Sequence, residues 1–471
     1  MSSAIGATKS LCSECRSLVP AEILEDDGRV VMVKHCPVHG DRRALTCSDA
    51  DWYRWSRRFL KPGRLPQFHA TESEAGCPYD CGFCPEHEQH ACVTLFEITQ
   101  ACNLECPACF AASPHGTHAD LAAIDAMLDA VTRAEGGTAD VVMLSGGEPT
   151  IHPQFVEVMR RVSQSGRVRH TVVNSNGIRF AKDSQLCAVA AELHVKVYLQ
   201  FDGFESGSLE LLRGKDLVDT KLRALDALGE AGVHVVLVGT IAKGVNDHEI
   251  GAIVKLGLDH PAVRAVSFQP QFGEGRWVPF DPMDRTTTTD VIHAVAKQTN
   301  GMFRATDFVP IPCCDPMCTA ATYAWVEDGR VTPLPRIVDV EHYLDYLENA
   351  ALPSLNPTLK ADFAEMRSTL ETLYSKSNPA GSEGQMTAFE CACGPIMEID
   401  ARDMTQHLFS ITIESFMDRW NFDVARAKRC CIQEAMPDGR IIPFCTYNTL
   451  YRFAPGHRAG PRPTSVSLAA E

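Results

Sequence analysis

Two cysteine triplets with the same spacing stand close together in the chain. They are Cys77, Cys81 and Cys84, followed by Cys102, Cys106 and Cys109, each in the pattern C-x3-C-x2-C. Three thiolates can hold three irons of a [4Fe-4S] cluster and leave the fourth iron open to a small molecule, whereas four thiolates close the cluster. The second triplet lacks an obvious fourth thiolate, so it predicts a cluster with an open iron.

The first triplet has further candidate ligands close behind it. Cys92 follows Cys84 by eight residues and offers a fourth thiolate, while His87 and His90 are weaker candidates. We therefore expect a closed auxiliary cluster at this triplet, with a zinc site as the main alternative.

A separate group of candidate ligands lies at the N-terminus. It consists of Cys12, Cys15, Cys36 and His39, in two short knuckles on either side of the extended stretch Arg29–Lys34. This spacing suits a tetrahedral zinc or a rubredoxin-like mononuclear iron. Cys47 is an alternative to His39 as the fourth ligand, and buried structural cysteines are the alternative to a metal site.

A third group of cysteines lies toward the C-terminus. Cys314, Cys318, Cys431 and Cys445 predict a second auxiliary cluster, with Cys313 and Cys430 as neighbouring substitutes. For Cys391 and Cys393 a structural role and a ligand role stay equally open. Cys187 lies within an apolar helical pattern and is expected to be a buried thiol.

The triplet Cys102, Cys106 and Cys109 directly follows the first of a series of alternating strands and helices. We expect strands at 93–99, 141–144, 170–174, 195–202, 233–240 and 263–269, with helices at 120–134, 152–163, 182–192, 218–231 and 247–256. Alternation of this kind is typical of a parallel α/β sheet. Six such repeats predict a partial (βα)6 TIM-like barrel, with its catalytic residues on the loops after the strands.

Polar or glycine-rich turns follow the next three expected strands. Ser145-Gly146-Gly147-Glu148-Pro149 ends the second strand, Asn174-Ser175-Asn176-Gly177 ends the third, and Gln200-Phe201-Asp202-Gly203 ends the fourth. Any one of these could be an ordinary tight turn. Their recurrence at successive strand ends indicates a single site at that end of the barrel.

Together with the second triplet, these turns resemble those of the radical S-adenosylmethionine (SAM) superfamily. The resemblance implies that Cys102, Cys106 and Cys109 carry a [4Fe-4S] cluster whose open iron binds SAM, and that its cleavage yields a 5'-deoxyadenosyl radical.

It also implies that Gly146, Gly147, Glu148 and Pro149 receive the methionine moiety and its ammonium, and that Asn174, Ser175 and Asn176 lie beside SAM. Asp202 is expected to bind ribose or substrate. Arg213 is expected either to bind the SAM carboxylate or to form an exposed salt bridge. Many members have a bulky residue where this chain has Ala108, so Phe110 is a candidate for contact with adenine.

Over nearly the whole chain, the cysteine groups and the late segment Pro437–Asn448 resemble the tetraether lipid synthase and class D radical SAM methylase group. This resemblance implies a mononuclear metal site, the SAM cluster and two auxiliary clusters. It also implies carbon-carbon bond formation between lipid alkyl chains. The alternative is methylation of a pterin or other small metabolite, and a distant alternative is a non-catalytic electron carrier. The partners expected are a lipid or small-molecule substrate and a reductant such as flavodoxin or ferredoxin.

The composition narrows the class of protein. The chain has 471 residues, is 45% hydrophobic, contains 20 cysteines and carries a formal charge of −16. Such acidity argues against a nucleic-acid partner. The start of the chain lacks a signal-like segment, and no apolar run is long enough to span a membrane, so we expect a cytoplasmic protein with reduced cysteines. Peripheral membrane contact stays open.

The patterns divide the chain into five parts. We expect a metal domain at 1–60, an auxiliary-cluster segment at 61–92, the barrel at 93–280, a second auxiliary-cluster region at 281–455 and a disordered tail at 456–471. Within the fourth part we also expect a helix at 357–375 and a mobile loop at 376–386.

Overall fold

The structure is a computed structural model that describes residues 2–111, 116–277, 280–312, 314–337, 340–343, 386–389, 397–399 and 407–452. The helix expected at 357–375, the loop expected at 376–386 except for its last residue, and the tail expected at 456–471 lie outside the described residues. So do Cys313, Cys391 and Cys393. Every cysteine that the structure describes is free of disulfide bonds.

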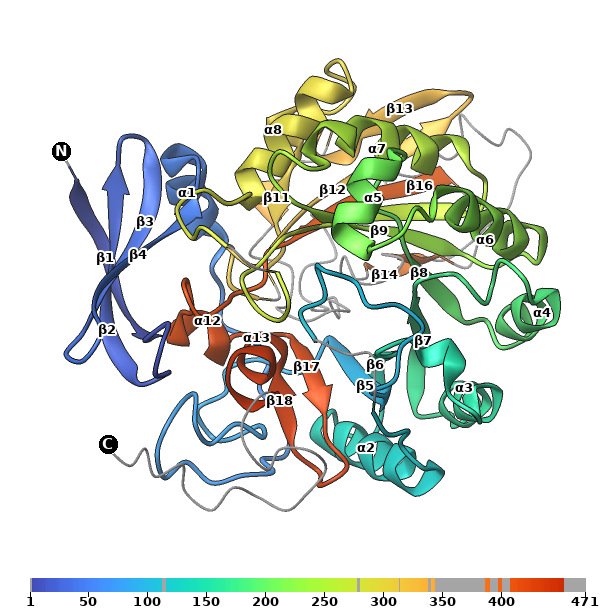
Figure 1. The fold of residues 1–471 in the computed structure, drawn as a ribbon, viewed down its shortest axis with the longest axis horizontal. Coiled ribbons are helices and arrows are strands. Elements are labelled where there is room, and N and C mark those ends of the chain that lie inside the picture. The colour runs from blue at the N-terminus through green and yellow to red at the C-terminus, as the bar shows by residue number, and fades with distance from the viewer. Residues whose placement is uncertain are drawn as a thin grey trace.

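Six parallel strands in sequence order form the centre of the main sheet (Figure 1). They are β5 (Val93–Thr99), β6 (Ala139–Gly146), β7 (Val168–Ser175), β8 (Lys196–Gln200), β9 (Val235–Ile241) and β10 (Val263–Pro270). Their apolar side chains are almost fully buried, as expected of parallel strands covered on both faces. The predicted partial barrel of six strands is confirmed.

Most helices between these strands pack along the outer face of the sheet: α2 (Leu121–Ala134), α3 (Phe155–Ser163), α4 (Ser184–Glu192), α6 (Val218–Glu230) and α7 (Ile250–Asp259). The short helix α5 (Ser206–Arg213) instead packs against the loop that follows β5. The Asp120 side chain accepts a hydrogen bond from the Ala123 backbone N–H and begins α2. Sequence analysis missed α5, which follows β8 directly and ends at Arg213.

The chain after β10 returns to both edges of the barrel sheet. On one side β16 (Leu408–Glu414) pairs in parallel with β10, and on the other β17 (Ile432–Ala435) pairs in parallel with β5. The outer positions are taken by β11 (Val309–Pro310), β12 (Thr319–Glu327), β13 (Arg330–Pro333) and β18 (Ile441–Pro443). Pairing between strands so far apart in the chain left no local pattern in the sequence.

Smaller elements complete the C-terminal half. The helices there are α8 (Thr288–Gln298), α9 (Val340–Tyr343), α12 (Val424–Lys428) and α13 (Phe444–Thr446), and β14 (Met386–Phe389) pairs with β15 (Met397–Ile399). No helix among the described residues is both long and apolar enough to cross a membrane.

The N-terminal residues form a separate four-stranded antiparallel sheet, drawn in dark blue in Figure 1. Its strands are β1 (Ser3–Leu11), β2 (Leu18–Asp26), β3 (Arg29–Cys36) and β4 (Gly40–Cys47), and the helix α1 (Ala50–Ser56) follows. The two expected knuckles are the β1–β2 turn and the β3–β4 turn, at the same end of this sheet.

Candidate active site and metal centres

A chamber opens at the carboxyl ends of the parallel strands. It encloses about 990 Å³, including the space at its open mouth. Its lining contains Cys102, Cys106, Cys109, Phe110, Gly146, Gly147, Glu148, Asn174, Ser175, Asn176 and Arg213. The fold therefore brings together nearly all the residues that sequence analysis assigned to the SAM site. Pro149 and Asp202 are the two that do not line the chamber.

The three thiols of the second triplet lie in the loop that follows β5. Burial raises the pKa of Cys102 to about 12 and also raises the pKa of Cys106, where the Arg213 charge opposes it. The Leu104 backbone N–H points at the Cys102 sulfur, 3.4 Å away. Three partly or fully buried thiols that line one chamber, with a backbone donor beside one of them, fit a [4Fe-4S] cluster with one open iron.

The two glycines after β6 allow a close approach of two loops. A Cβ atom at Gly146 would lie 2.0 Å from the Thr99 carbonyl oxygen, and one at Gly147 would lie 2.1 Å from the Ala101 carbonyl oxygen. The Gly147 and Glu148 backbone N–H groups donate to the same two carbonyls, at 2.8 and 2.9 Å. Any larger residue would separate this turn from the loop that carries Cys102.

Glu148 connects the turns after β6 and β7. Its buried carboxylate accepts hydrogen bonds from the Thr150 hydroxyl, the Ser175 hydroxyl at 2.8 Å and the Asn176 backbone N–H at 2.8 Å. With these protein donors, the carboxylate positions the chamber wall. The expected contact of the nearby backbone with a SAM ammonium remains a prediction.

Two residues that sequence analysis missed support the same wall. The Asn176 amide donates to the Asn103 side chain, 2.7 Å away in the cluster loop. The buried Lys221 ammonium donates to the Asn176 carbonyl at 2.6 Å and to the Gln200 side chain at 3.0 Å, and burial lowers its pKa to about 8. Lys221 lies on a helix with no motif around it, so no sequence signal could have singled it out.

Arg213 and Asp202 form a buried, two-pronged ion pair. The Arg213 Nε and Nη2 donate to the two Asp202 carboxylate oxygens at 2.7 and 2.6 Å, and Asp202 also accepts from the Thr240 backbone N–H. The Arg213 side chain is 6% exposed, so the salt bridge is buried and the prediction of an exposed one is wrong. Asp202 lies behind the wall with both oxygens occupied, so its contacts give no support to the expected contact with ribose or substrate.

Phe110 lies where the chamber meets the C-terminal segment. Its ring packs against Phe272 at 5.3 Å and edge-on against Phe444 at 5.6 Å between centroids. Ala108 also lines the chamber, so the small side chain at that position leaves room beside the third cysteine. Phe444 directly precedes Cys445, and the aromatic contact therefore connects the second triplet with the third cysteine group.

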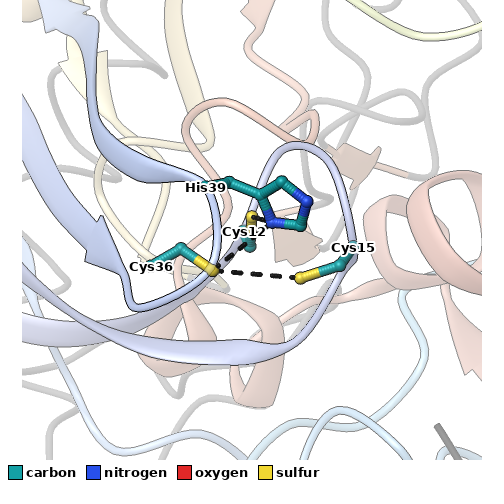
Figure 2. Close-up of side chains that lie close together, drawn as sticks. All are labelled: Cys12, Cys15, Cys36 and His39. Atoms are coloured by element: carbon teal, nitrogen blue, oxygen red, sulfur yellow. Dashed lines mark hydrogen bonds between the residues drawn. The ribbon is translucent and has the colours of Figure 1, made fainter. Parts of the chain in front are cut away.

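The N-terminal group converges as Figure 2 shows, with all four side chains turned toward one point. The donor atoms of Cys12, Cys15, Cys36 and His39 all lie within 4.8 Å of one another. A backbone N–H at Val38 and the His39 ring lower the pKa of Cys36 to about 6. This donor set fits a tetrahedral zinc or a mononuclear iron.

Cys47 is not part of the N-terminal group. Its thiol is buried at the end of β4, where it donates to the Asp49 carbonyl and lies 3.5 Å from the Thr289 hydroxyl. Burial raises its pKa to about 11. The alternative in which Cys47 replaces His39 is therefore wrong, because Cys47 lies opposite Val30 at one end of the β3–β4 pair, whereas the knuckle lies at the other end, where Cys36 is opposite Gly40.

The first triplet lines a small cavity of its own. Cys77, Cys81 and Cys84 surround it together with His87. Cys92 is not among its lining residues; its thiol lies 3.6 Å from the His90 ring. The weaker candidate His87 thus shares the cavity with the three thiols, and the arrangement gives no support to Cys92 as the closing ligand.

The third group also converges, although its members come from distant segments. Cys314, Cys431 and Cys445 lie in one apolar cluster, and Cys318 packs at its edge. A hydrogen bond with Cys314, together with burial, raises the pKa of Cys318. The buried Arg426 guanidinium lies 3.5 Å from the Cys318 sulfur and supplies a positive charge beside the thiols. Sequence analysis missed this arginine.

Of the substitutes expected for this group, Cys430 is described. Its thiol donates to the Ile432 carbonyl at 3.0 Å, and burial with the nearby Cys445, Cys431 and Cys318 raises its pKa. Elsewhere, Cys187 is a buried thiol on α4, as expected, and its pKa is raised to about 11 by burial.

Comparison with known families agrees with the chamber. Residues 96–257, which span β5 to β9 and most of α7, match the model of the radical SAM superfamily. Residues 4–48 match the HMPTM N-terminal zinc ribbon domain. The chain belongs to the radical SAM superfamily and is an enzyme of that class. Membership implies a [4Fe-4S] cluster and SAM as cofactors, for which the second triplet and the chamber are the fitting site.

Among individual relatives, the chain is 32% identical to the 7,8-dihydro-6-hydroxymethylpterin dimethyltransferase of Methanocaldococcus jannaschii, with 94% of each chain covered. A shorter match, 25% identical, joins 35% of this chain to 49% of the GTP 3',8-cyclase of Actinobacillus succinogenes. Neither relative is named for the coupling of lipid chains.

Solved structures with a similar fold include SuiB of Streptococcus suis bound to SAM and the hydrogenase maturase HydG. SuiB is 15% identical, with 45% of this chain and 47% of SuiB covered and a TM-score of 0.37. HydG is 14% identical, with 45% of this chain and 50% of HydG covered and a TM-score of 0.36. The chain thus spans about half the length of these two proteins.

Proposed function

We propose that the protein is a radical SAM methylase that acts on a reduced pterin with a hydroxymethyl substituent. The observation that carries this proposal is the likeness, over 94% of both chains, to a dimethyltransferase named for such a pterin. The likeness extends beyond the barrel to the N-terminal and C-terminal cysteine groups. It favours the methylase alternative of the sequence analysis over the coupling of lipid chains.

The chemistry of the chamber wall supports a polar heterocycle as substrate. Five amide side chains line it, from Asn174, Asn176, Gln200, Gln269 and Gln271. Amides offer donors and acceptors side by side, which match the ring N–H and carbonyl groups of a pterin. An alkyl chain would leave the Asn174 amide and the Gln200 NH2 group desolvated without partners, which is unfavourable. Lipid coupling therefore has less support from this wall than pterin binding.

Asn174 is best placed for direct contact with a ligand. It lies one residue before the end of β7 and lines the chamber, and within the described residues its side-chain amide has no hydrogen-bond partner. The Gln200 amide oxygen is already bonded to Lys221, which leaves its NH2 group to donate. The rings of Phe110 and Phe272 form an apolar surface in the same chamber, on which a flat heterocycle can stack.

The chain's own residues would prepare the chamber for radical chemistry. A [4Fe-4S] cluster with SAM, when bound, supplies a 5'-deoxyadenosyl radical. Arg213 directs its remaining Nη1 donors away from Asp202, and these can bind a carboxylate in the chamber. Phe110 and Phe272 give the chamber an apolar wall, which disfavours water where hydrogen would be abstracted.

The other cysteine groups enter this proposal as further metal centres. We assign zinc or mononuclear iron to the N-terminal group and auxiliary [4Fe-4S] clusters to the first and third groups. We also propose a small electron carrier, such as flavodoxin or ferredoxin, as reductant, and the cytoplasm as the compartment.

The proposal is tested with anaerobically reconstituted protein, SAM, a reductant, a 6-hydroxymethyl dihydropterin and an isotopically labelled one-carbon donor. We expect 5'-deoxyadenosine and a pterin that has gained one and then two labelled methyl groups in mass spectrometry. Cys106→Ala should abolish both products. Cys187→Ala removes a buried thiol outside every cysteine group and is the matched control, which should keep both.

Two outcomes would contradict the proposal. Deoxyadenosine formed with no label in the pterin would mean that the enzyme acts on another substrate. Joining of two alkyl chains, when lipid is offered in place of the pterin, would restore the lipid-coupling alternative.

A further inference from the structure

Outside the chamber and the cysteine groups, one cluster of side chains offers metal ligands. A carboxylate oxygen of Glu205, a ring nitrogen of His248 and a carboxylate oxygen of Glu249 all lie within 4.8 Å of one another. Glu205 immediately precedes α5, and the other two residues immediately precede α7, so the cluster lies at the starts of two helices that Figure 1 labels. None of the three lines the chamber.

Glu249 is the unusual member of this cluster. The residue is 5% exposed, and one carboxylate oxygen accepts hydrogen bonds from the backbone N–H groups of Phe204 and Glu205. The other oxygen, Oε1, is buried and has no hydrogen-bond partner in the described part of the chain. A buried carboxylate oxygen without a partner is unfavourable, so a missing partner is indicated.

The local backbone is shaped to hold this carboxylate. A Cβ atom at Gly203 would lie 2.4 to 2.5 Å from all three atoms of the Glu249 carboxylate group, and Gly203 has φ +152°. Only glycine leaves that space. The Asn246 amide, which is fully buried, donates to the Asp202 and Thr240 carbonyls at 2.7 and 2.8 Å and fixes the segment that leads to Glu249. The surrounding backbone therefore holds the Glu249 carboxylate in a fixed, buried position.

The two other side chains complete a ligand set. His248 Nε2 lies 3.0 Å from the Glu205 carboxylate, and both side chains are about half exposed, so a cation can enter from solvent. No lysine or arginine among the described residues pairs with Glu249. Two carboxylates balance the charge of a divalent ion, and a set of two carboxylates and one imidazole suits Mn²⁺, Fe²⁺ or Zn²⁺ better than Mg²⁺ or Ca²⁺.

We propose that Glu205, His248 and Glu249 bind a divalent transition-metal ion, which fastens the start of α5 to the start of α7. The ion supplies the partner that the buried Glu249 oxygen lacks. Because α5 ends at Arg213 in the chamber wall, the ion also stabilises the helix that positions this arginine. The site is structural and takes no part in the chemistry of the chamber.

The test uses the full-length protein with its clusters in the oxidised, diamagnetic state and its N-terminal site loaded with Zn²⁺. Mn²⁺ is titrated, and the free ion is followed by electron paramagnetic resonance. We expect one equivalent to bind to the wild type, with a spin-echo modulation from one imidazole nitrogen. His248→Ala should weaken binding at least tenfold and remove the modulation, and Glu249→Gln should weaken binding at least tenfold.

His35→Ala is the matched control. His35 forms a similar exposed pair with Asp41, at 2.6 Å, and no third ligand joins that pair among the described residues. Its removal should leave Mn²⁺ binding unchanged. Glu249→Gln changes a buried residue and can disturb folding, so the exposed variants His248→Ala and Glu205→Gln decide the matter. Equal binding by the wild type and these two variants would overturn the proposal.

Discussion

The buried pair of Arg213 and Asp202 allows the two roles expected of Arg213 to be separated. Asp202 occupies Nε and Nη2 of the guanidinium, and the Thr240 hydroxyl accepts a further bond from Nη2 at 2.9 Å. No described residue accepts a hydrogen bond from Nη1, and the side chain lines the chamber. The arginine can therefore bind a SAM carboxylate with Nη1 while Asp202 fixes its orientation.

The two partners should respond differently to substitution. Asp202→Asn keeps the shape but leaves a buried guanidinium without its counter-charge, and loss of one partner of a buried pair costs about 3–5 kcal/mol of stability. Arg213→Met should cost a similar amount of stability. It should also remove a charge-assisted hydrogen bond to SAM worth about 1.5–3 kcal/mol, which corresponds to roughly tenfold to hundredfold weaker SAM binding.

Both quantities can be measured on protein with its clusters bound under anaerobic conditions. Thermal unfolding should show both variants melting lower by on the order of 5 °C. Equilibrium dialysis against labelled SAM should show a large loss for Arg213→Met and a smaller one for Asp202→Asn, which keeps the guanidinium. If Arg213→Met melts lower but binds SAM as tightly as the wild type, the arginine is only structural and the reasoning is refuted.

Three other substitutions test separate parts of the structure. His39→Ala should release the N-terminal metal to a colorimetric chelator, whereas Cys47→Ser should retain it, because only His39 converges with the three thiols. Gly147→Ala should impair SAM binding, since its Cβ would collide with the Ala101 carbonyl; unchanged SAM binding would contradict the close approach. Burial, with the Glu97 charge, raises the pKa of Glu434. The folded state thus holds a proton that the unfolded state releases. The stability that this difference contributes is fully present below pH about 4.5 and is lost as pH rises through the folded pKa. Glu434→Gln should therefore flatten the decline of melting temperature with rising pH and raise the free energy of unfolding by on the order of 1 kcal/mol at high pH. An unchanged slope would count against a raised pKa at Glu434.

Local patterns were sufficient for the barrel and for the residues at its mouth. Strand and helix periods, and turns such as Ser145–Pro149 and Asn174–Gly177, are recorded in consecutive residues, so β5 to β10 and most of the SAM site could be read directly. The knuckles of Cys12, Cys15, Cys36 and His39 were equally local. Their spacing left Cys47 as an alternative because spacing alone does not show that β4 carries Cys47 to the opposite end of the sheet from the knuckles.

The features decided only in three dimensions depend on contacts between distant segments. The pairing of β16 with β10 and of β17 with β5 joins residues more than 140 positions apart, and no periodicity records such a partner. Burial likewise decided that Asp202 binds Arg213, that Lys221 supports the wall and that Arg426 lies beside Cys318. The sequence by itself determined that two identical triplets exist and that one opens into a barrel. Only the tertiary structure decided what surrounds each triplet, because the charges and donors that tune a thiol come from whichever segments the fold packs against it.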